Sequence, residues 1–308
     1  MGTNQLPAAP VIYIIEPFGG SIRRQNNNLP HVFYDDAAVT RGDGVFESIL
    51  VRDGEPVNLK GHFERFSRSA KLLELPEPEE KSWRDATVQA TQDYLRERGG
   101  EASDAKCTWT YTRGRASTGV PSAWITLSEV PQSALDQRTH GVKAMTAPRG
   151  YSITPNLPES KDAAPWLAVG AKTINYAANM AALRWARKQD FDEVIYIEPA
   201  TGQVLEGATS TVVVVKKGMK LRTPTPGIDV LHGTTQKAIF DYAEKHGWRC
   251  KTRDLTVDDL VAAESVWLVS STRIATRVKR IDDVKLPTPD NEAELRELFD
   301  NALTAAIN

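Results

Sequence analysis

The sequence has little of the material that builds disulfide-rich, zinc-binding or membrane proteins. It has two cysteines among 308 residues, Cys107 and Cys250, and no His/Cys cluster with metal-ligand spacing. We therefore expect reduced thiols, a cytoplasmic protein and no metal site. No apolar run approaches the roughly 20 residues that a membrane-spanning helix needs. The first ten residues lack a basic segment followed by an apolar core, so no secretory signal is expected.

Neither sign of charge dominates, because 38 Lys and Arg face 40 Asp and Glu and the net charge is -2. This balance argues against a binder of nucleic acid or of acidic membranes. The 41% hydrophobic and 25% charged residues are typical of a soluble globular protein. A chain of this length predicts two domains. We place them at 1–132 and 141–308, joined by a polar, helix-poor linker over 133–140.

The stretch Lys172-Thr173-Ile174-Asn175-Tyr176 carries the clearest chemical signal. It follows a mostly apolar run over 166–171 and precedes a segment with helical spacing of apolar residues over 177–188. A lysine held close to apolar surface loses hydration, which favours its neutral amine and allows attack on a carbonyl. The alternative is that Lys172 extends to solvent from a strand end.

Upstream, a helix is predicted over 60–70. His62, Arg65 and Ser69 lie three and four residues apart, so they share one face of that helix. The guanidinium fork of Arg65 suits a phosphate group. The alternative is that Arg65 pairs with a helix carboxylate at the surface.

Three arginines lie beside predicted turns. Arg41 precedes Gly42-Asp43-Gly44, where two glycines around an aspartate indicate a tight turn with unusual backbone angles, and a strand over 45–52 follows. This loop either lines the mouth of a pocket or is an ordinary turn. Arg113 and Arg115, after a strand over 106–111, either offer charge to an anionic substrate or form a solvated surface pair.

The second half holds a carboxylate and two hydroxyl-rich turns. Glu206 lies in an otherwise apolar and small-residue passage, and a buried carboxylate needs a partner, either a nearby base or a ligand. Thr234-Thr235 opens a helix after Gly233, so backbone N–H groups and hydroxyls would form an anion site, although threonine is also an ordinary N-cap. Ser271-Thr272 belongs to the other turn. A long proline-containing loop over 148–165 is of the kind that often carries function.

These features follow one another in a fixed order: Gly-Asp-Gly-Val-Phe-Glu, His-x-x-Arg, Lys before Asn-Tyr, Glu-Gly and Gly-Thr-Thr. The ordered set resembles the class IV aminotransferases, the pyridoxal-phosphate enzymes of fold type IV, over nearly the whole chain. The resemblance implies a mixed α+β, two-domain fold like that of the D-amino acid aminotransferases. It also implies pyridoxal 5'-phosphate as cofactor, a small amino substrate and a homodimer.

The same resemblance assigns roles to individual residues. Lys172 would join the cofactor covalently and move the proton, while Glu206 would pair with the pyridine nitrogen and keep it protonated. Arg65 and the Thr234-Thr235 helix start would bind the phosphate. The remaining cofactor-binding residues are expected to be Ser271 and Thr272, which stand where many relatives have Gly-Thr, together with Tyr176, Thr209 and Ser210.

The substrate side resembles one branch of the family. Arg41 and Leu50 stand where branched-chain enzymes usually carry an aromatic residue and an arginine. Thr112-Arg113-Gly114 resembles the lyases and the D-amino acid enzymes, although the arginine-x-histidine carboxylate trap of the latter is missing. The combination looks most like actinobacterial proteins of the aminodeoxychorismate lyase type. The expected substrate-binding residues are Arg41, Ser48, Arg113 and Arg115.

The expected reaction is therefore elimination of pyruvate from 4-amino-4-deoxychorismate, which gives 4-aminobenzoate for folate synthesis. The alternative within the family is a transaminase acting on D-amino acids, branched-chain amino acids or R-amines. A third possibility is a binding protein that kept the fold and lost the chemistry.

Overall fold

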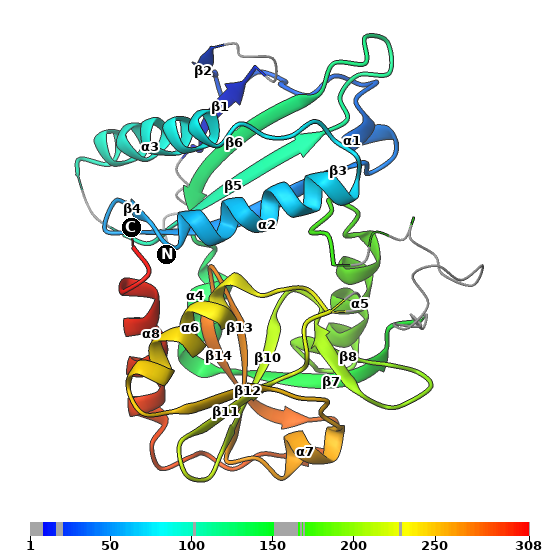
Figure 1. The fold of residues 1–308 in the computed structure, drawn as a ribbon, viewed down its shortest axis with the longest axis vertical. Helices are drawn as coiled ribbons and strands as arrows, with labels where there is room; N and C mark the ends of the chain where they lie inside the picture. Colours follow the sequence, from blue (N-terminus) through cyan, green and yellow to red (C-terminus); the bar gives the residue numbers. More distant parts are fainter. Residues whose placement is uncertain are drawn as a thin grey trace, which may run out of the picture. The chain divides into compact units, whose positions relative to one another are not determined.

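The computed structural model describes residues 9–16, 21–100, 103–150, 166, 168, 170–227 and 230–307. The chain forms two compact units, and both contain separate stretches of sequence. The first unit comprises Met1–Pro131, Ala171–Asn175 and Ile307–Asn308, and the second comprises Gln132–Gly170 and Tyr176–Ala306. Figure 1 shows the order of the elements along the chain.

The first unit is built on one antiparallel sheet. Its strand order is β2 (Ile22–Arg24), β1 (Val11–Ile15), β6 (Ser122–Glu129), β5 (Ala105–Thr112), β3 (Gly44–Arg52) and β4 (Glu55–Pro56). Its helices are α1 (Ala37–Thr40), α2 (Leu59–Leu72) and α3 (Glu80–Glu97).

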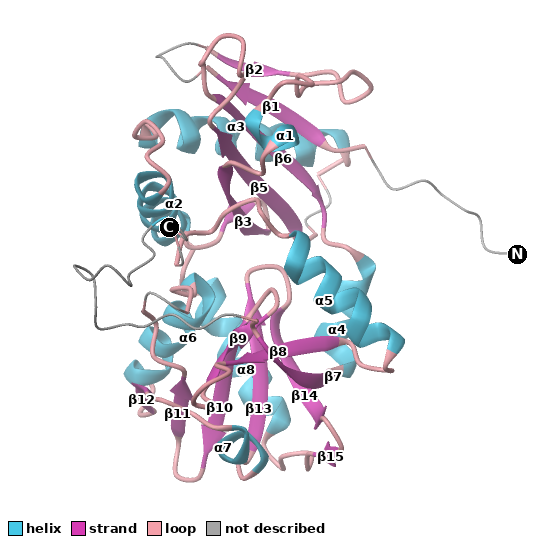
Figure 2. Cartoon of the chain, turned by 90° about the vertical axis from the view of Figure 1, so that its right-hand side faces the viewer, coloured by secondary structure: helices cyan, strands magenta, loops and turns pink. Residues whose placement is uncertain are grey.

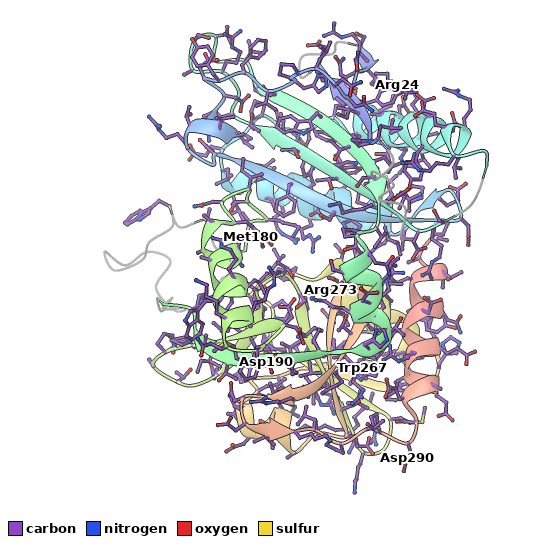
Figure 3. All side chains as sticks on the ribbon, turned by 180° about the vertical axis from the view of Figure 1, so that it is seen from behind. Arg24, Met180, Asp190, Trp267, Arg273 and Asp290 are labelled. Atoms are coloured by element: carbon purple, nitrogen blue, oxygen red, sulfur yellow. The ribbon has the colours of Figure 1, made fainter. Side chains whose placement is uncertain are left out.

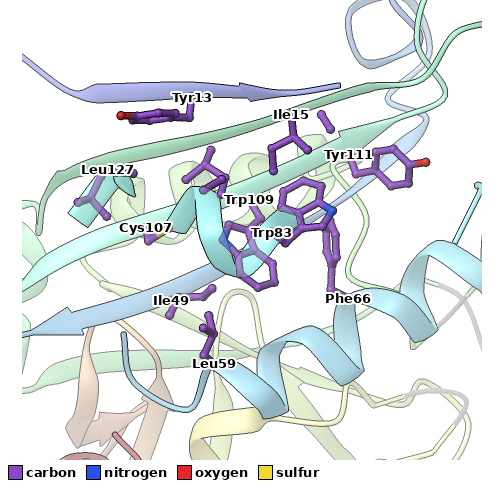
Figure 4. Close-up of a cluster of buried hydrophobic side chains, with 14 of the residues drawn as sticks. Tyr13, Ile15, Ile49, Leu59, Phe66, Trp83, Cys107, Trp109, Tyr111 and Leu127 are labelled. Carbon is purple, nitrogen blue, oxygen red and sulfur yellow. The ribbon is translucent and has the colours of Figure 1, made fainter. Parts of the chain in front are cut away.

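An aromatic cluster fills the space between this sheet and the helices α2 and α3 (Figure 4). Phe66 of α2 and Trp83 of α3 each place their ring centroid 5.4 Å from that of Trp109 on β5. Side chains alternate between the two faces of a strand. Glu47 therefore points to the same face of β3 as the buried Ile49, and it enters the first unit's core as a charged residue.

The segment Ala171–Asn175 extends the first unit's sheet beside the start of β3. The Phe46 N–H donates to the Lys172 carbonyl at 3.0 Å, and the Ile174 N–H donates to the Gly44 carbonyl at 2.9 Å. A Cβ atom on Gly44 would lie 3.1 Å from Ile174 Cδ1 and 2.7 Å from the Tyr111 carbonyl oxygen, so a larger residue would not fit. The sequence-based division places Lys172 in the second domain, but these hydrogen bonds place it in the first unit.

The second unit contains a mixed sheet of nine strands (Figure 2). The order is β12 (Arg249–Thr252), β11 (Lys220–Thr223), β10 (Thr211–Lys216), β13 (Ser265–Ser270), β14 (Ile274–Ile281), β7 (Val142–Pro148), β8 (Glu193–Ile197) and β9 (Val204–Gly207), with β15 (Val284–Lys285) beside β14. Its helices are α4 (Gln132–His140), α5 (Ala177–Lys188), α6 (Thr234–Lys245), α7 (Val257–Val261) and α8 (Glu292–Thr304).

The second sheet curls, because β9, the last strand in the order, also approaches β10 within the sheet. The Gly207 N–H at the end of β9 donates to the Ser210 carbonyl before β10 at 2.8 Å. The β-branched run Val212–Val215 of β10 is fully buried, as its composition predicts. The two sheets together give the expected mixed fold.

Two sequence-based expectations about elements are wrong. The polar segment at 133–140 was expected to be a helix-poor linker, but it forms helix α4, which contains no glycine or proline. The Arg138 side chain fixes α4 by donating to the Thr272 carbonyl at 2.9 Å, and such tertiary contacts override weak helix propensity. The pattern also missed β14, whose charged residues interrupt its apolar alternation, together with β2, β11, β12, β15 and α1.

Several expectations concern residues that the structure does not describe. They are the absence of a signal sequence in residues 1–8, most of the loop over 148–165, and part of the apolar run before Lys172. Within the described ranges, the structure contains no helix with the length and apolar character that crossing a membrane requires.

Candidate active site

Helix α2 presents a polar stripe to a buried carboxylate in the first unit. His62, Arg65 and Ser69 share one face of this helix, as their spacing predicts, and all three are buried. Arg65 donates from Nε and Nη2 to the two carboxylate oxygens of Glu47 at 2.7 and 2.6 Å. His62 Nδ1 lies 2.7 Å from Glu47 Oε2. Arg65 therefore pairs with a buried strand carboxylate, and the alternative of a surface helix carboxylate is wrong.

The cluster holds one negative and one positive charge away from water. Burial alone raises the pKa of Glu47, but the charge and hydrogen bonds of Arg65, aided by His62, outweigh it and lower this pKa to about 2. Burial lowers the pKa of His62, and the attraction of Glu47 offsets this only in part. Glu47 is consequently ionised and His62 neutral at pH 7. Because an ionised carboxylate only accepts hydrogen bonds, His62 donates from Nδ1.

Lys172 lies beside this cluster in the first unit. Its backbone N–H donates to Ser69 Oγ at 3.0 Å, which ties the lysine to the same stripe of α2. Its Nζ lies 4.3 Å from the centroid of the Phe46 ring, within the range of a cation–π contact. The lysine is half-buried and its amine lies against an aromatic face, in keeping with the expected apolar surroundings. The first unit thus brings together Lys172 and Arg65.

The predicted substrate arginines have different partners. Arg113 donates from Nε to Asp43 Oδ2 at 2.7 Å and from Nη2 to the Leu73 carbonyl at 2.5 Å. It thereby joins the Gly-Asp-Gly turn to the end of α2. Arg41 is exposed, donates to the Thr40 carbonyl at 2.8 Å, and has no ion pair among the described residues. Ser48 is half-buried on β3, opposite Thr108.

Arg115 belongs to a separate ion pair in the loop that follows β5. Its Nε donates to Asp35 Oδ1 at 3.0 Å, and its guanidinium lies 4.0 Å from the centroid of the Phe33 ring. Arg113 is exposed, as the surface interpretation expected, and Arg115 is half-buried; each arginine has its own carboxylate.

In the second unit, the two hydroxyl-rich turns meet. Thr234 and Thr235 are buried at the start of α6, and Thr235 Oγ1 lies 3.5 Å from Ser271 Oγ. The N-cap residue Gly233 has no side chain that could cap the start of α6. A Cβ atom on Gly233 would lie 2.5 Å from Thr211 Oγ1, which explains the glycine. This arrangement suits an anion such as a phosphate.

A buried ion pair supports the turn that holds Ser271 and Thr272. Arg273, labelled in Figure 3, forms an ion pair with Glu193, and both side chains are buried. Arg273 also donates from Nη2 to Thr209 Oγ1 at 3.0 Å, so the predicted cofactor residue Thr209 contacts the pair. Ile274 follows with φ of 59°, a strained conformation for a β-branched residue.

The remaining predicted cofactor residues lie in three places of the second unit. Glu206 is half-buried on β9 and accepts the Leu231 N–H at 3.3 Å. Tyr176 occupies the N-cap of α5. Ser210 Oγ is buried without a hydrogen-bond partner among the described residues. A Cβ atom on Gly207 would lie 2.2 Å from this oxygen. The hydrogen bond from the Leu231 N–H connects Glu206 to the loop that leads into α6.

The amino-transferase class IV family model matches residues 44–281. The chain belongs to the class IV aminotransferases. The match includes the motifs that carried the resemblance, except for Gly42 and Asp43 at the start of the first motif, and the predicted family is confirmed. As a class IV aminotransferase the protein is an enzyme that uses pyridoxal 5'-phosphate, either a lyase or an aminotransferase.

Relatives of this class IV aminotransferase include a bifunctional aminodeoxychorismate lyase / D-amino acid transaminase from Mycobacterium tuberculosis, 40% identical over 90% of this chain and 95% of that protein. A D-alanine aminotransferase from Staphylococcus haemolyticus is 27% identical over 83% of this chain and 86% of its own. The fold matches a PLP-bound hypothetical aminotransferase from M. tuberculosis, with 37% identity, a TM-score of 0.86, and coverage of 95% and 99% of the two chains. The predicted fold type is thereby confirmed.

The residues of this chain fit pyridoxal phosphate. Lys172 offers an amine to the aldehyde, and the hydroxyl groups of Thr235 and Ser271 beside the start of α6 offer donors to a phosphate. Among the described residues, no group of His, Cys, Asp or Glu side chains is arranged to hold a metal ion.

The sequence interpretation gave no role to Glu47, Phe46 or the Arg273–Glu193 pair. Glu47 had a detectable signal, because it occupies an inward position of an otherwise apolar strand. No feature of the sequence indicated that Glu193 is the partner of Arg273, since the two residues are far apart along the chain.

The buried histidine predicts a dependence of stability on pH. The unfolded chain should protonate His62 near its ordinary pKa of 6.5, while the folded chain does so only at lower pH. The free energy of unfolding should therefore fall as the pH drops below about 6.5. Glu47, whose pKa is lowered from 4.5 to about 2, should add a further loss below about 4.5.

Urea unfolding between pH 7.5 and 5.5 tests this expectation. His62→Gln keeps a hydrogen-bond donor for Glu47 and cannot titrate, so the variant should lose less stability over this interval. Parallel curves for the two proteins would show that His62 is not the group responsible.

Proposed function

We propose that Lys172 holds the cofactor and transfers the proton in the reaction. Pyridoxal phosphate, when bound, supplies an electron sink for charge that develops beside the substrate's amino group. Lys172 offers a half-buried amine on Phe46, and Ser69 fixes its backbone. We assign Arg65 to the phosphate, and Glu206 to the pyridine nitrogen, where a carboxylate keeps that nitrogen protonated.

We assign the phosphate also to the second unit's hydroxyl groups. Thr235 and Ser271 lie close enough to share one anion. Thr234 and Thr272 flank them in sequence, and the Arg273 pair supports the turn from behind. Thr209, Ser210 and Tyr176 complete the proposed cofactor-binding set.

We infer that the enzyme eliminates pyruvate from 4-amino-4-deoxychorismate and releases 4-aminobenzoate, a step of folate synthesis. The observation that carries this proposal is the 40% identity over nearly the full length of the bifunctional mycobacterial relative. Arg41 beside the Gly-Asp-Gly turn agrees with it, because this substrate carries carboxylates that an arginine could bind.

The proposal is tested by supplying 4-amino-4-deoxychorismate to the cofactor-loaded enzyme and following pyruvate and 4-aminobenzoate. Lys172→Ala should lower the rate at least about a thousandfold, the scale expected when a nucleophile and proton carrier is removed. Lys188→Ala, an exposed lysine at the end of α5, serves as the control and should retain activity. Absence of both products from the loaded wild-type enzyme would reject the lyase activity.

Transamination of D-amino acids is the second candidate. It is favoured by the name of the bifunctional relative and by a solved M. tuberculosis aminotransferase that contains α-ketoglutarate and PMP. Spectroscopy of the half-reaction separates the two activities. In a transaminase, a D-amino acid donor would convert the cofactor from its aldehyde form to its amine form. This conversion would occur without 4-amino-4-deoxychorismate and without release of pyruvate from it.

Arg41 is the arginine that we assign to a substrate carboxylate. Asp43 and Asp35 already neutralise Arg113 and Arg115, whereas Arg41 has no carboxylate partner in the described part of the chain. Loss of a charged hydrogen bond should raise KM about 10- to 100-fold in Arg41→Gln, with little change in stability. Arg113→Gln should instead lower the melting temperature. Equal KM values for Arg41→Gln and the wild type would move the role to another residue.

We propose that the enzyme is a homodimer. Large apolar side chains are exposed around α1 in the first unit, including Tyr34 at 82% and Val39 at 62%, with Phe33 and Leu29 nearby in sequence. Exposed apolar surface of this kind marks interaction sites. Light scattering coupled to gel filtration should give twice the 34.0 kDa chain mass, and Tyr34→Lys with Val39→Lys should shift it toward the monomer. An unchanged mass in the double variant would exclude this surface.

We place the enzyme in the cytoplasm, because both of its cysteines are free thiols. Burial raises the pKa of Cys107 to about 12, which keeps this thiol protonated and unreactive. Cell fractionation with an antibody would test the location.

A further inference from the structure

Glu47 is a charged residue in a position that the rest of its strand uses for the hydrophobic core. Its side chain is fully buried, on the same face of β3 as Val45, Ile49 and Val51. A buried carboxylate costs free energy unless it is paired and hydrogen-bonded. Glu47 has both kinds of partner, since Arg65 and His62 bind its two oxygens.

The contacts leave Arg65 little freedom. Two of its nitrogens, Nε and Nη2, each donate to a different oxygen of Glu47, which fixes the plane of the guanidinium. Arginine has a long side chain with high conformational entropy, and such a paired fork removes most of it before a ligand arrives. The orientation of the third nitrogen, Nη1, then follows from the position of Glu47.

We propose that Glu47 is a positioning residue for phosphate recognition, which holds Arg65 in the orientation that binds the cofactor's phosphate. This inference rests on the proposed assignment of Arg65 to the phosphate. His62 strengthens the arrangement, because its Nδ1–H fixes the second lone pair of Glu47 Oε2. Ser69, on the same stripe of α2 as Arg65, accepts the Lys172 backbone N–H, so the cofactor's aldehyde and phosphate partners share one support.

Charge and geometry make opposite predictions for this residue. The negative charge of Glu47 weakens the attraction between Arg65 and a phosphate dianion. If Glu47 acted only through its charge, its removal would tighten binding of the cofactor. A positioning role predicts weaker binding, because Arg65 would lose its fixed orientation and would be a buried cation without its partner.

The experiment compares dissociation constants for pyridoxal 5'-phosphate and for pyridoxal, which has the aldehyde and lacks the phosphate. Glu47→Gln should weaken pyridoxal phosphate about 10- to 100-fold, the range for lost hydrogen bonds to charged groups. Binding of pyridoxal should change less than about twofold. Glu64→Gln is the matched control, since Glu64 is an exposed carboxylate of the same helix. It should change neither constant.

A second variant covers the case in which Glu47→Gln does not fold. Glu47→Asp keeps the charge but is one methylene shorter, so it cannot hold both Arg65 nitrogens and His62 together. It should also lower the preference for pyridoxal phosphate over pyridoxal. An unchanged or increased preference in a folded Glu47 variant would overturn the inference.

Arg65→Gln separates this inference from the proposed function. Selective loss of pyridoxal phosphate in Arg65→Gln, with none in either Glu47 variant, would keep the phosphate role of Arg65 and reject that of Glu47. Equal loss of both ligands in Arg65→Gln would reject the phosphate assignment itself.

Discussion

Two backbone hydrogen bonds between residues 172–174 and the start of β3 determine where the reactive amine lies. They place the Lys172 side chain on Phe46 and its backbone against Ser69. The requirement for a close approach explains Gly44, which has no room for a side chain between Tyr111 and Ile174. The Gly-Asp-Gly turn therefore serves the lysine by making the edge of β3 accessible to a distant part of the chain.

Both units contain a buried arginine–glutamate pair that includes, or is next in sequence to, a group that we assign to the phosphate. In the first unit the pair is Arg65 and Glu47, and in the second it is Arg273 and Glu193. Buried ion pairs contribute little net stability, because desolvation of the two charges offsets their attraction. Their advantage is geometric, since a guanidinium held at several points has one orientation. The strained backbone of Ile274 beside Arg273 agrees with a turn whose shape is imposed by its surroundings.

The sequence predicted what is local or periodic. The stripe of His62, Arg65 and Ser69 followed from helical spacing, and the buried strand over 212–215 followed from its β-branched residues. The family followed from the order of several short motifs. The partners of the arginines did not, because Glu47, Asp43 and Glu193 are brought to them by the fold and not by spacing. Helix α4 was missed because its polar sequence has weak helical periodicity and depends on contacts such as that of Arg138.

The discontinuous first unit has a consequence for how the protein is made. Lys172 is 103 residues downstream of its partner Ser69, and Ile307, which pairs with Val57, comes from still farther along the chain. At about 5–20 residues per second, synthesis of the 103 residues takes roughly 5 to 20 seconds. During that interval the edge of β3 has no neighbour from this segment, and an unpaired strand edge can recruit other chains. The nascent protein therefore passes through an aggregation-sensitive stage that lasts until the segment around Lys172 has been synthesised and has paired with β3.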